Sequence, residues 1–146
     1  MSTHDTDYYA WTYETAAKLR QGKFNEVDMN QIAEELEEMG RSERHELENR
    51  LAVLLAHLLK WQYQPDRRGN SWRLTIDEQR VRIRRVLKQN PSLKPKLAES
   101  ASEAYLIAIP QAARETHLAK NTFPPTFEQT NWMVEQVLDD EFYPES

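Results

Sequence analysis

The proline-free stretch of residues 28–64, which is followed directly by Pro65, limits the fold of this chain more than any other feature. Asp28 and Gln31 have the spacing of a reciprocal capping box, which predicts that a helix begins here. Proline cannot continue a helix, so Pro65 marks the latest point at which the helix ends. The second half of the stretch repeats leucines at helical spacing: Leu47, Leu51, Leu54 and Leu58. We therefore predict a long helical region with residues 51–59 as its most buried part.

Gly40 and Ser42 lie in the middle of this region. One continuous helix over residues 28–64 would reach roughly 50 Å at 1.5 Å per residue. That length is large beside the radius of gyration of about 15 Å for a domain of this size. Gly40 can act as a C-terminal cap or a kink, and Ser42 can act as a new N-cap. We therefore expect two helices or one bent helix.

Capping residues, apolar spacing and prolines predict four further helices. They are residues 5–21, 71–89, 92–112 and 126–138. Pro110 should kink or restart the third of these because it cannot donate a helical hydrogen bond. The acidic residues 139–146 should form a loose tail. The sequence thus predicts an all-α, single-domain bundle of about five or six helices over residues 1–146, with one long or kinked central helix.

Two apolar stripes near the N-terminus need cover from other parts of the protein. The first predicted helix carries Tyr9 and Tyr13 on one face and needs a partner to stay folded. The first half of the long region carries Ile32, Leu36 and Met39 on one side, and glutamates cover the rest of its surface.

Composition excludes several classes of function. The 146-residue chain has no cysteine, which excludes disulfides, thiolate metal sites and cysteine nucleophiles. Its three glycines lie far apart, so neither a glycine-rich dinucleotide turn nor a phosphate-binding loop can form. No apolar run of about 18 residues could span a membrane, and the polar, acidic start lacks the pattern of a signal peptide. We expect a cytoplasmic protein with no membrane contact and no cofactor.

Three stretches of the chain resemble a known protein family. They read YAW at residues 9–11, IAEELEEMGRSE at residues 32–43 and LLAHLLKWQYQP at residues 54–65. The family consists of bacterial, largely cyanobacterial, proteins catalogued as domain of unknown function twenty-nine. The likeness covers nearly the whole chain and is weakest at residues 131–135. It implies an all-helical fold and a small intracellular protein, but no functional residue can be carried over because no activity is established for the family.

Four side chains are candidates for a catalytic pocket: Glu38, Glu43, His57 and Arg80. His57 lies one helical turn before Trp61 and could act as an acid or base if it lined a cleft. A core histidine resting on Trp61 is the commoner arrangement. Glu43 would fall near the apolar stripe of a continuous helix, where a carboxylate would need an arginine partner. An enzyme built on these residues is the weaker alternative.

Metal binding is not predicted. The residue three positions before each of His45, His57 and His117 is never glutamate, so the Glu-x-x-His pattern of di-metal bundles is absent. His45 opens a zinc-protease-like segment, but asparagine occupies the position of the second histidine. The carboxylates of Glu34, Glu38 and Glu43 could hold Mg²⁺ or Mn²⁺, although a solvated acidic helix face is the better interpretation.

Charge is distributed unevenly along the chain. Residues 1–50 hold twelve acidic and six basic side chains, whereas residues 65–88 hold eight basic side chains and three acidic ones. The basic region could bind nucleic acid through arginines with Trp72 stacking on bases: Arg67, Arg68, Arg73, Arg80, Arg84 and Arg85. Alternatively, the basic helix packs beside the acidic one and the charges pair. We favour packing, because a net charge of −5 weakens attraction to nucleic acid.

The absence of catalytic motifs and the segregation of charge favour a non-catalytic interaction or scaffold protein. It would act through a helical surface toward a protein partner or toward itself. Nucleic-acid binding is the alternative function.

Overall fold

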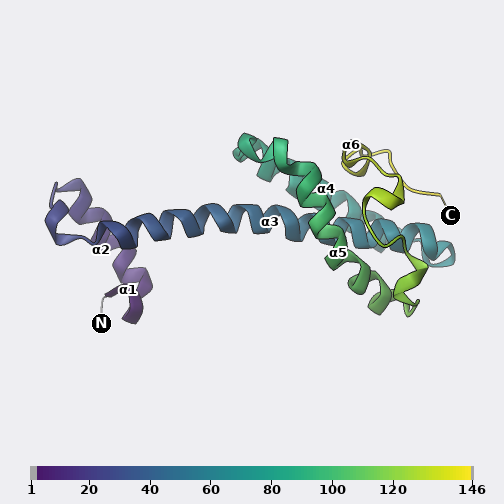
Figure 1. The fold of residues 1–146 in the computed structure, drawn as a ribbon, viewed down its shortest axis with the longest axis horizontal. Helices are drawn as coiled ribbons and strands as arrows, with labels where there is room; N and C mark the ends of the chain where they lie inside the picture. Colours follow the sequence, from purple (N-terminus) through teal and green to yellow (C-terminus); the bar gives the residue numbers. More distant parts are fainter. Residues whose placement is uncertain (1–2, 146) are drawn as a thin grey trace. The chain divides into compact units, whose positions relative to one another are not determined.

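The computed structural model describes residues 3–145 of the chain. This part of the protein is all-α, with six α-helices, five short 3₁₀-helices and no strand (Figure 1). The prediction of an all-α bundle with a long central helix is therefore confirmed. The chain divides into two compact units, Met1–Arg41 and Ser42–Ser146, which we call the N-terminal unit and the C-terminal unit.

The central helix α3 runs without a break over Met29–Tyr63. Its start is as predicted, because the Gln31 backbone N–H donates to Asp28 Oδ1 at 3.1 Å. Of the two alternatives predicted for this region, two separate helices are therefore wrong, because the helix passes through Gly40. Glycine in a helix costs about 1 kcal/mol relative to alanine, which is too little to end a helix whose next turn carries an ion pair of 2.8 Å between Arg41 and Glu38.

The N-terminal unit contains α1 (Thr3–Thr6), α2 (Tyr8–Arg20), the 3₁₀-helix η1 (Phe24–Glu26) and the first part of α3. The predicted helix over residues 5–21 is divided because Asp7 caps α2, accepting from the Ala10 N–H at 3.1 Å. Gly22 follows α2 with a φ of +74°, a left-handed conformation that favours glycine and turns the chain back. None of the described residues 3–41 is buried.

The C-terminal unit holds the hydrophobic core. It contains the rest of α3, η2 (Pro65–Arg67), α4 (Asn70–Gln89), η3 (Pro91–Lys96) and α5 (Leu97–Thr116), followed by the short elements η4 (Lys120–Thr122), η5 (Glu128–Thr130) and α6 (Val134–Val137). Figure 1 shows α4 and α5 beside the second half of α3. The leucines of residues 51–59 have no exposed surface, which confirms that this segment lies at the centre. Alanines let α5 approach the core closely: Ala101, Ala104, Ala108 and Ala112.

Two helix predictions in this unit are wrong. The helix predicted over residues 92–112 begins at Leu97, after η3, and continues through Pro110. The helix predicted over residues 126–138 is replaced by η5 and α6. Asn131 lies between them with a φ of +63°, and the hydroxyl of Thr130 accepts the N–H of Trp132 at 3.0 Å. These local bonds compete with a continuous helix.

Candidate functional site

Arg80 is the most buried charged side chain of the described residues, with 0% of its surface exposed. Its guanidinium donates to three backbone carbonyl oxygens of the C-terminal segment: Val137 at 2.9 Å, Asp140 at 3.3 Å and Phe142 at 2.6 Å. Burial lowers the pKa of Arg80, although arginine stays charged. The planar group satisfies three acceptors at once, so its geometry is that of a structural clamp.

This clamp holds part of the C-terminal segment, residues 139–146, for which the sequence predicts a loose acidic tail. Phe142 and Tyr143 are half-buried and pack against the core. The Tyr143 ring lies 4.8 Å from the Trp61 ring, and Arg73 and Arg80 lie over it at 4.9 and 5.3 Å. The segment therefore makes specific contacts as far as Tyr143.

The other candidate nucleic-acid residues are also largely engaged within the C-terminal unit. Arg84 donates to the Leu138 carbonyl oxygen at 2.7 Å and pairs with Asp140. Arg68 donates to the Trp61 carbonyl oxygen at 2.6 Å. Trp72 is half-buried, with the Lys60 ammonium 4.8 Å from its ring centre. The exposed members of the set are Arg67, Arg73, Arg84 and Arg85.

The catalytic candidates have separate partners. Glu43 accepts from the Asn90 amide at 3.2 Å and lines a surface pocket of about 400 Å³ with Arg82 and Arg85. His57 is buried, and its Nδ1 donates to the Val53 carbonyl oxygen at 2.9 Å. Among the described residues no hydrogen bond or ion pair joins Glu43, His57 and Arg80. Glu38 belongs to the N-terminal unit, where Arg41 donates to it.

Sequence reasoning missed Lys60 and Glu115. Lys60 is buried, and its ammonium lies 3.3 Å from a Glu115 carboxylate oxygen. Burial lowers the pKa of the neighbouring His57, the Lys60 charge lowers it further, and the Val53 carbonyl and Glu115 charge oppose the shift. The signal was present in the sequence, because Lys60 stands in a run that is apolar on nearly every side. Among the described residues, no group of three or more His, Asp or Glu side chains is placed to hold a metal ion.

The N-terminal unit carries an apolar groove of about 190 Å³ between α2 and the first part of α3. Its lining residues lie about one helical turn apart on both helices. The apolar members include Trp11, Ala16, Leu19, Ile32, Leu36 and Met39. Leu36 is 62% exposed and Met39 is also exposed, so the stripe predicted on α3 is present but is not covered within this unit. Open apolar surface of this kind marks interaction sites.

A polar cluster of His4, Tyr8 and Glu35 lies at one end of this groove. His4 Nε2 donates to a Glu35 carboxylate oxygen at 2.9 Å, and the Tyr8 hydroxyl donates to the other oxygen. The bond to Glu35 raises the pKa of His4, while the bonds from Tyr8 and then His4 lower the pKa of Glu35. The His4 ring also meets the Trp11 ring edge-on at 4.7 Å. These contacts fix α1 against α3 and set the position of Trp11.

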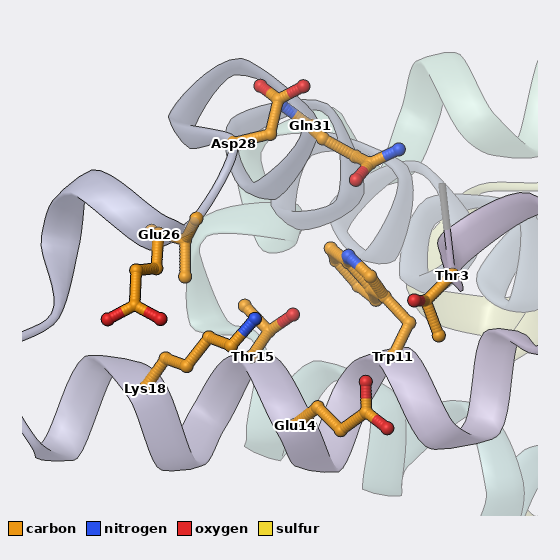
Figure 2. Close-up of a pocket in the computed structure, with 9 residues that line it drawn as sticks. Thr3, Trp11, Glu14, Thr15, Lys18, Glu26, Asp28 and Gln31 are labelled. Atoms are coloured by element: carbon orange, nitrogen blue, oxygen red, sulfur yellow. The ribbon is translucent and has the colours of Figure 1, made fainter. Parts of the chain in front are cut away.

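Two polar pockets adjoin the groove and share residues with it. One, of about 310 Å³, shares Trp11 and Thr15 with the groove. Figure 2 shows its lining, which includes three carboxylates and one ammonium group besides Trp11: Glu14, Glu26, Asp28 and Lys18. The other, of about 380 Å³, shares Glu35 and is lined by Glu34 and Glu38. Acidic side chains therefore line the two pockets that adjoin the groove, together with the basic side chains of Lys18 and Arg41.

The charge of the whole chain resides in this unit. Residues 1–41 hold nine acidic and four basic side chains, a net charge of −5, while residues 42–146 hold fifteen of each. The acidic excess therefore lies in the N-terminal unit, while the C-terminal unit, which contains the basic residues 65–88, has no net charge.

Comparison with known proteins gives a family but no activity. Within residues 3–145 no helix is both long and apolar enough to cross a membrane. No curated protein and no solved structure matches the chain. One family model matches residues 3–143, which is nearly the full length. The chain therefore belongs to the family described as domain of unknown function DUF29.

Proposed function

We propose that this protein is a non-catalytic interaction module that binds an amphipathic helix of a partner protein in the groove of the N-terminal unit. The observation that carries the proposal is the combination of an apolar groove with a unit in which no described residue is buried. Helices of this length gain most of their stability from packing of an apolar face. A partner helix would supply the missing layer.

The groove has the pattern that accepts a helix. Its lining residues on α3 are Ile32, Glu35, Leu36 and Met39, spaced by three or four positions. Those on α2 follow the same spacing from Tyr8 to Leu19. Helix-in-groove recognition uses apolar anchors at the i, i+3 or i+4, and i+7 positions of the guest. A guest helix with that spacing can seat its anchors between the two lining stripes.

The arrangement of the C-terminal unit gives the alternatives less support. Arg68, Arg80 and Arg84 donate to backbone carbonyl oxygens, so half of the six candidate arginines are engaged within the chain. Nucleic-acid binding would depend on Arg67, Arg73 and Arg85. An enzyme would need Glu43 and His57 to act together, yet each has a different partner.

The test uses the full chain and a synthetic helical peptide with leucines at i, i+4 and i+7 and glutamines elsewhere. Fluorescence anisotropy should detect binding, and Leu36→Asp should weaken it by about tenfold or more, which corresponds to about 1.4 kcal/mol. Leu74→Asp is the matched control, because Leu74 is 58% exposed on α4 of the other unit. Failure of the wild-type chain to bind, or equal weakening by both variants, would overturn the proposal.

A further inference from the structure

We infer that the helix bound by this groove is cationic, with lysine or arginine beside its apolar face. The inference rests on the proposed function and names the chemistry of the partner. It starts from charge complementarity, since the groove belongs to a unit with a net charge of −5 and carboxylates line the two polar pockets that adjoin it.

Three carboxylates in these pockets are unpaired among the described residues of the unit, and Lys18, which lines the pocket of Glu14 and Glu26, forms no ion pair with either. Glu14, Glu26 and Glu34 are exposed and form no ion pair with any residue in the described part of the chain. Glu38 differs because Arg41 pairs with it at 2.8 Å. A guest helix bearing positive charge beside its apolar face would pair with carboxylates of the adjoining pockets while that face enters the groove.

The aromatic lining suits such a guest. Trp11 contributes to the apolar groove and to the polar pocket that holds Glu14 and Glu26. A lysine or arginine at the edge of the guest can lay its alkyl stem on this ring and direct its charge to the carboxylates beyond it. Trp11 is held in place by the edge-on contact with His4.

The same charge disfavours other occupants. A second copy would bring another unit of net charge −5 against the first, which opposes association at ordinary salt. Nucleic acid and an anionic lipid surface would be repelled in the same way. A cationic amphipathic helix of another protein has an apolar face that matches the groove and a positive charge that complements the acidic unit.

The experiment compares three synthetic peptides that share one leucine face. All remaining positions are lysine in the first peptide, glutamine in the second and glutamate in the third. Each is titrated against the full chain by fluorescence anisotropy, at low and at high salt. We expect the lysine peptide to bind about tenfold or more tighter than the glutamine peptide at low salt, and the glutamate peptide to bind weakest. High salt should narrow these differences.

Two variants assign the charge effect to the groove. The double substitution Glu14→Gln and Glu34→Gln should reduce the preference for lysine and leave the affinity of the glutamine peptide unchanged. Glu135→Gln, an exposed position in the C-terminal unit, is the matched control and should change neither affinity. Circular dichroism checks that each variant keeps its helical content.

The outcomes separate this inference from the proposed function. Equal binding of all three peptides, abolished by Leu36→Asp, would retain the groove and overturn the cationic partner. Lysine-peptide binding that persists in Leu36→Asp would show attraction to charge alone and overturn both. Sedimentation that reveals a dimer, dissociated by Leu36→Asp, would assign the groove to a second copy and overturn the inference as well.

Discussion

Both units have apolar residues at helical spacing, but these residues are buried in the C-terminal unit and largely exposed in the N-terminal unit. The C-terminal unit buries its leucines and alanines beneath α4, α5 and the chain that follows them, and its acidic and basic side chains are equal in number. The N-terminal unit has apolar stripes on α2 and α3, but Leu36 and Met39 remain exposed, and acidic side chains outnumber basic ones. The difference shows that a helical repeat predicts a face to be covered and leaves open what covers it.

The largest expected effect is the difference in stability loss between a leucine truncation in the C-terminal unit and one in the N-terminal unit. Leu54→Ala removes a side chain with 0% exposure and should lower the free energy of unfolding by about 2–5 kcal/mol. Leu36→Ala should change it by less than about 0.5 kcal/mol, as for exposed positions. Urea denaturation followed by circular dichroism measures both. Similar losses for the two variants would mean that Leu36 is covered in solution.

The next effect concerns the clamp on the C-terminal segment. Arg80→Lys keeps the charge but loses the planar group that reaches three carbonyl oxygens, so we expect a loss of about 2–3 kcal/mol. Arg82→Lys is the control, because Arg82 is exposed and pairs only with Glu78 among the described residues. Limited proteolysis should cleave the last residues faster in Arg80→Lys alone, and unchanged protection would argue against the clamp.

Two glycines of the N-terminal unit should respond with opposite signs. Gly22→Ala places a Cβ in a left-handed conformation and should destabilise the turn by about 1–2 kcal/mol. Gly40→Ala adds a Cβ that meets no atom within 4 Å and should stabilise α3 by about 0.5–1 kcal/mol. Amide hydrogen exchange in α2 and α3 reports both changes. Faster exchange around residue 40 in Gly40→Ala would contradict the continuous helix.

The smallest effect is a difference in histidine titration between the units. The Glu35 bond raises the pKa of His4 above its ordinary 6.5, while burial lowers the pKa of His57 below that value. NMR titration should place them on opposite sides of 6.5, and Glu35→Gln should lower the pKa of His4 without moving that of His57. A His4 pKa that stays unchanged in Glu35→Gln would contradict the hydrogen bond between the two side chains.

These shifts also set the pH range of each contribution to stability. His4 has a raised pKa, so its contribution is complete below pH 6.5 and is lost as pH rises through the folded-state value. Glu35 has a lowered pKa, so its contribution is complete above 4.5 and is lost as pH falls through its folded-state value. The bond between them should therefore stabilise the N-terminal unit most between about pH 4.5 and 6.5. His57, with its lowered pKa, makes the core less stable as pH falls.

The sequence was sufficient for the core but not for the details that depend on distant contacts. Leucine spacing over residues 51–59 identified the centre because a helix that is apolar on nearly every side must be buried. The break expected at Gly40 did not occur, since one glycine opposes a long helix only weakly. The helix predicted over residues 126–138 is interrupted where the Thr130 hydroxyl and the Gln136 amide oxygen accept local backbone N–H groups.

The candidate site was only partly predictable for a related reason. The basic helix was recognisable from composition, but nothing local indicated that Arg80 would face the end of the chain, 57 residues from its acceptor on Val137. The stripe of Ile32, Leu36 and Met39 was also recognisable. Its exposure followed only from the three-dimensional arrangement of the unit that holds it.

The Arg80 clamp has an evolutionary consequence. All three of its acceptors are main-chain oxygens, which every amino acid supplies. Side chains at Asp140 and Phe142 can therefore drift without loss of these bonds, whereas a single inserted or deleted residue between Val137 and Phe142 would misalign them. Natural variants of this chain should tolerate substitution in the segment far better than a change in its length.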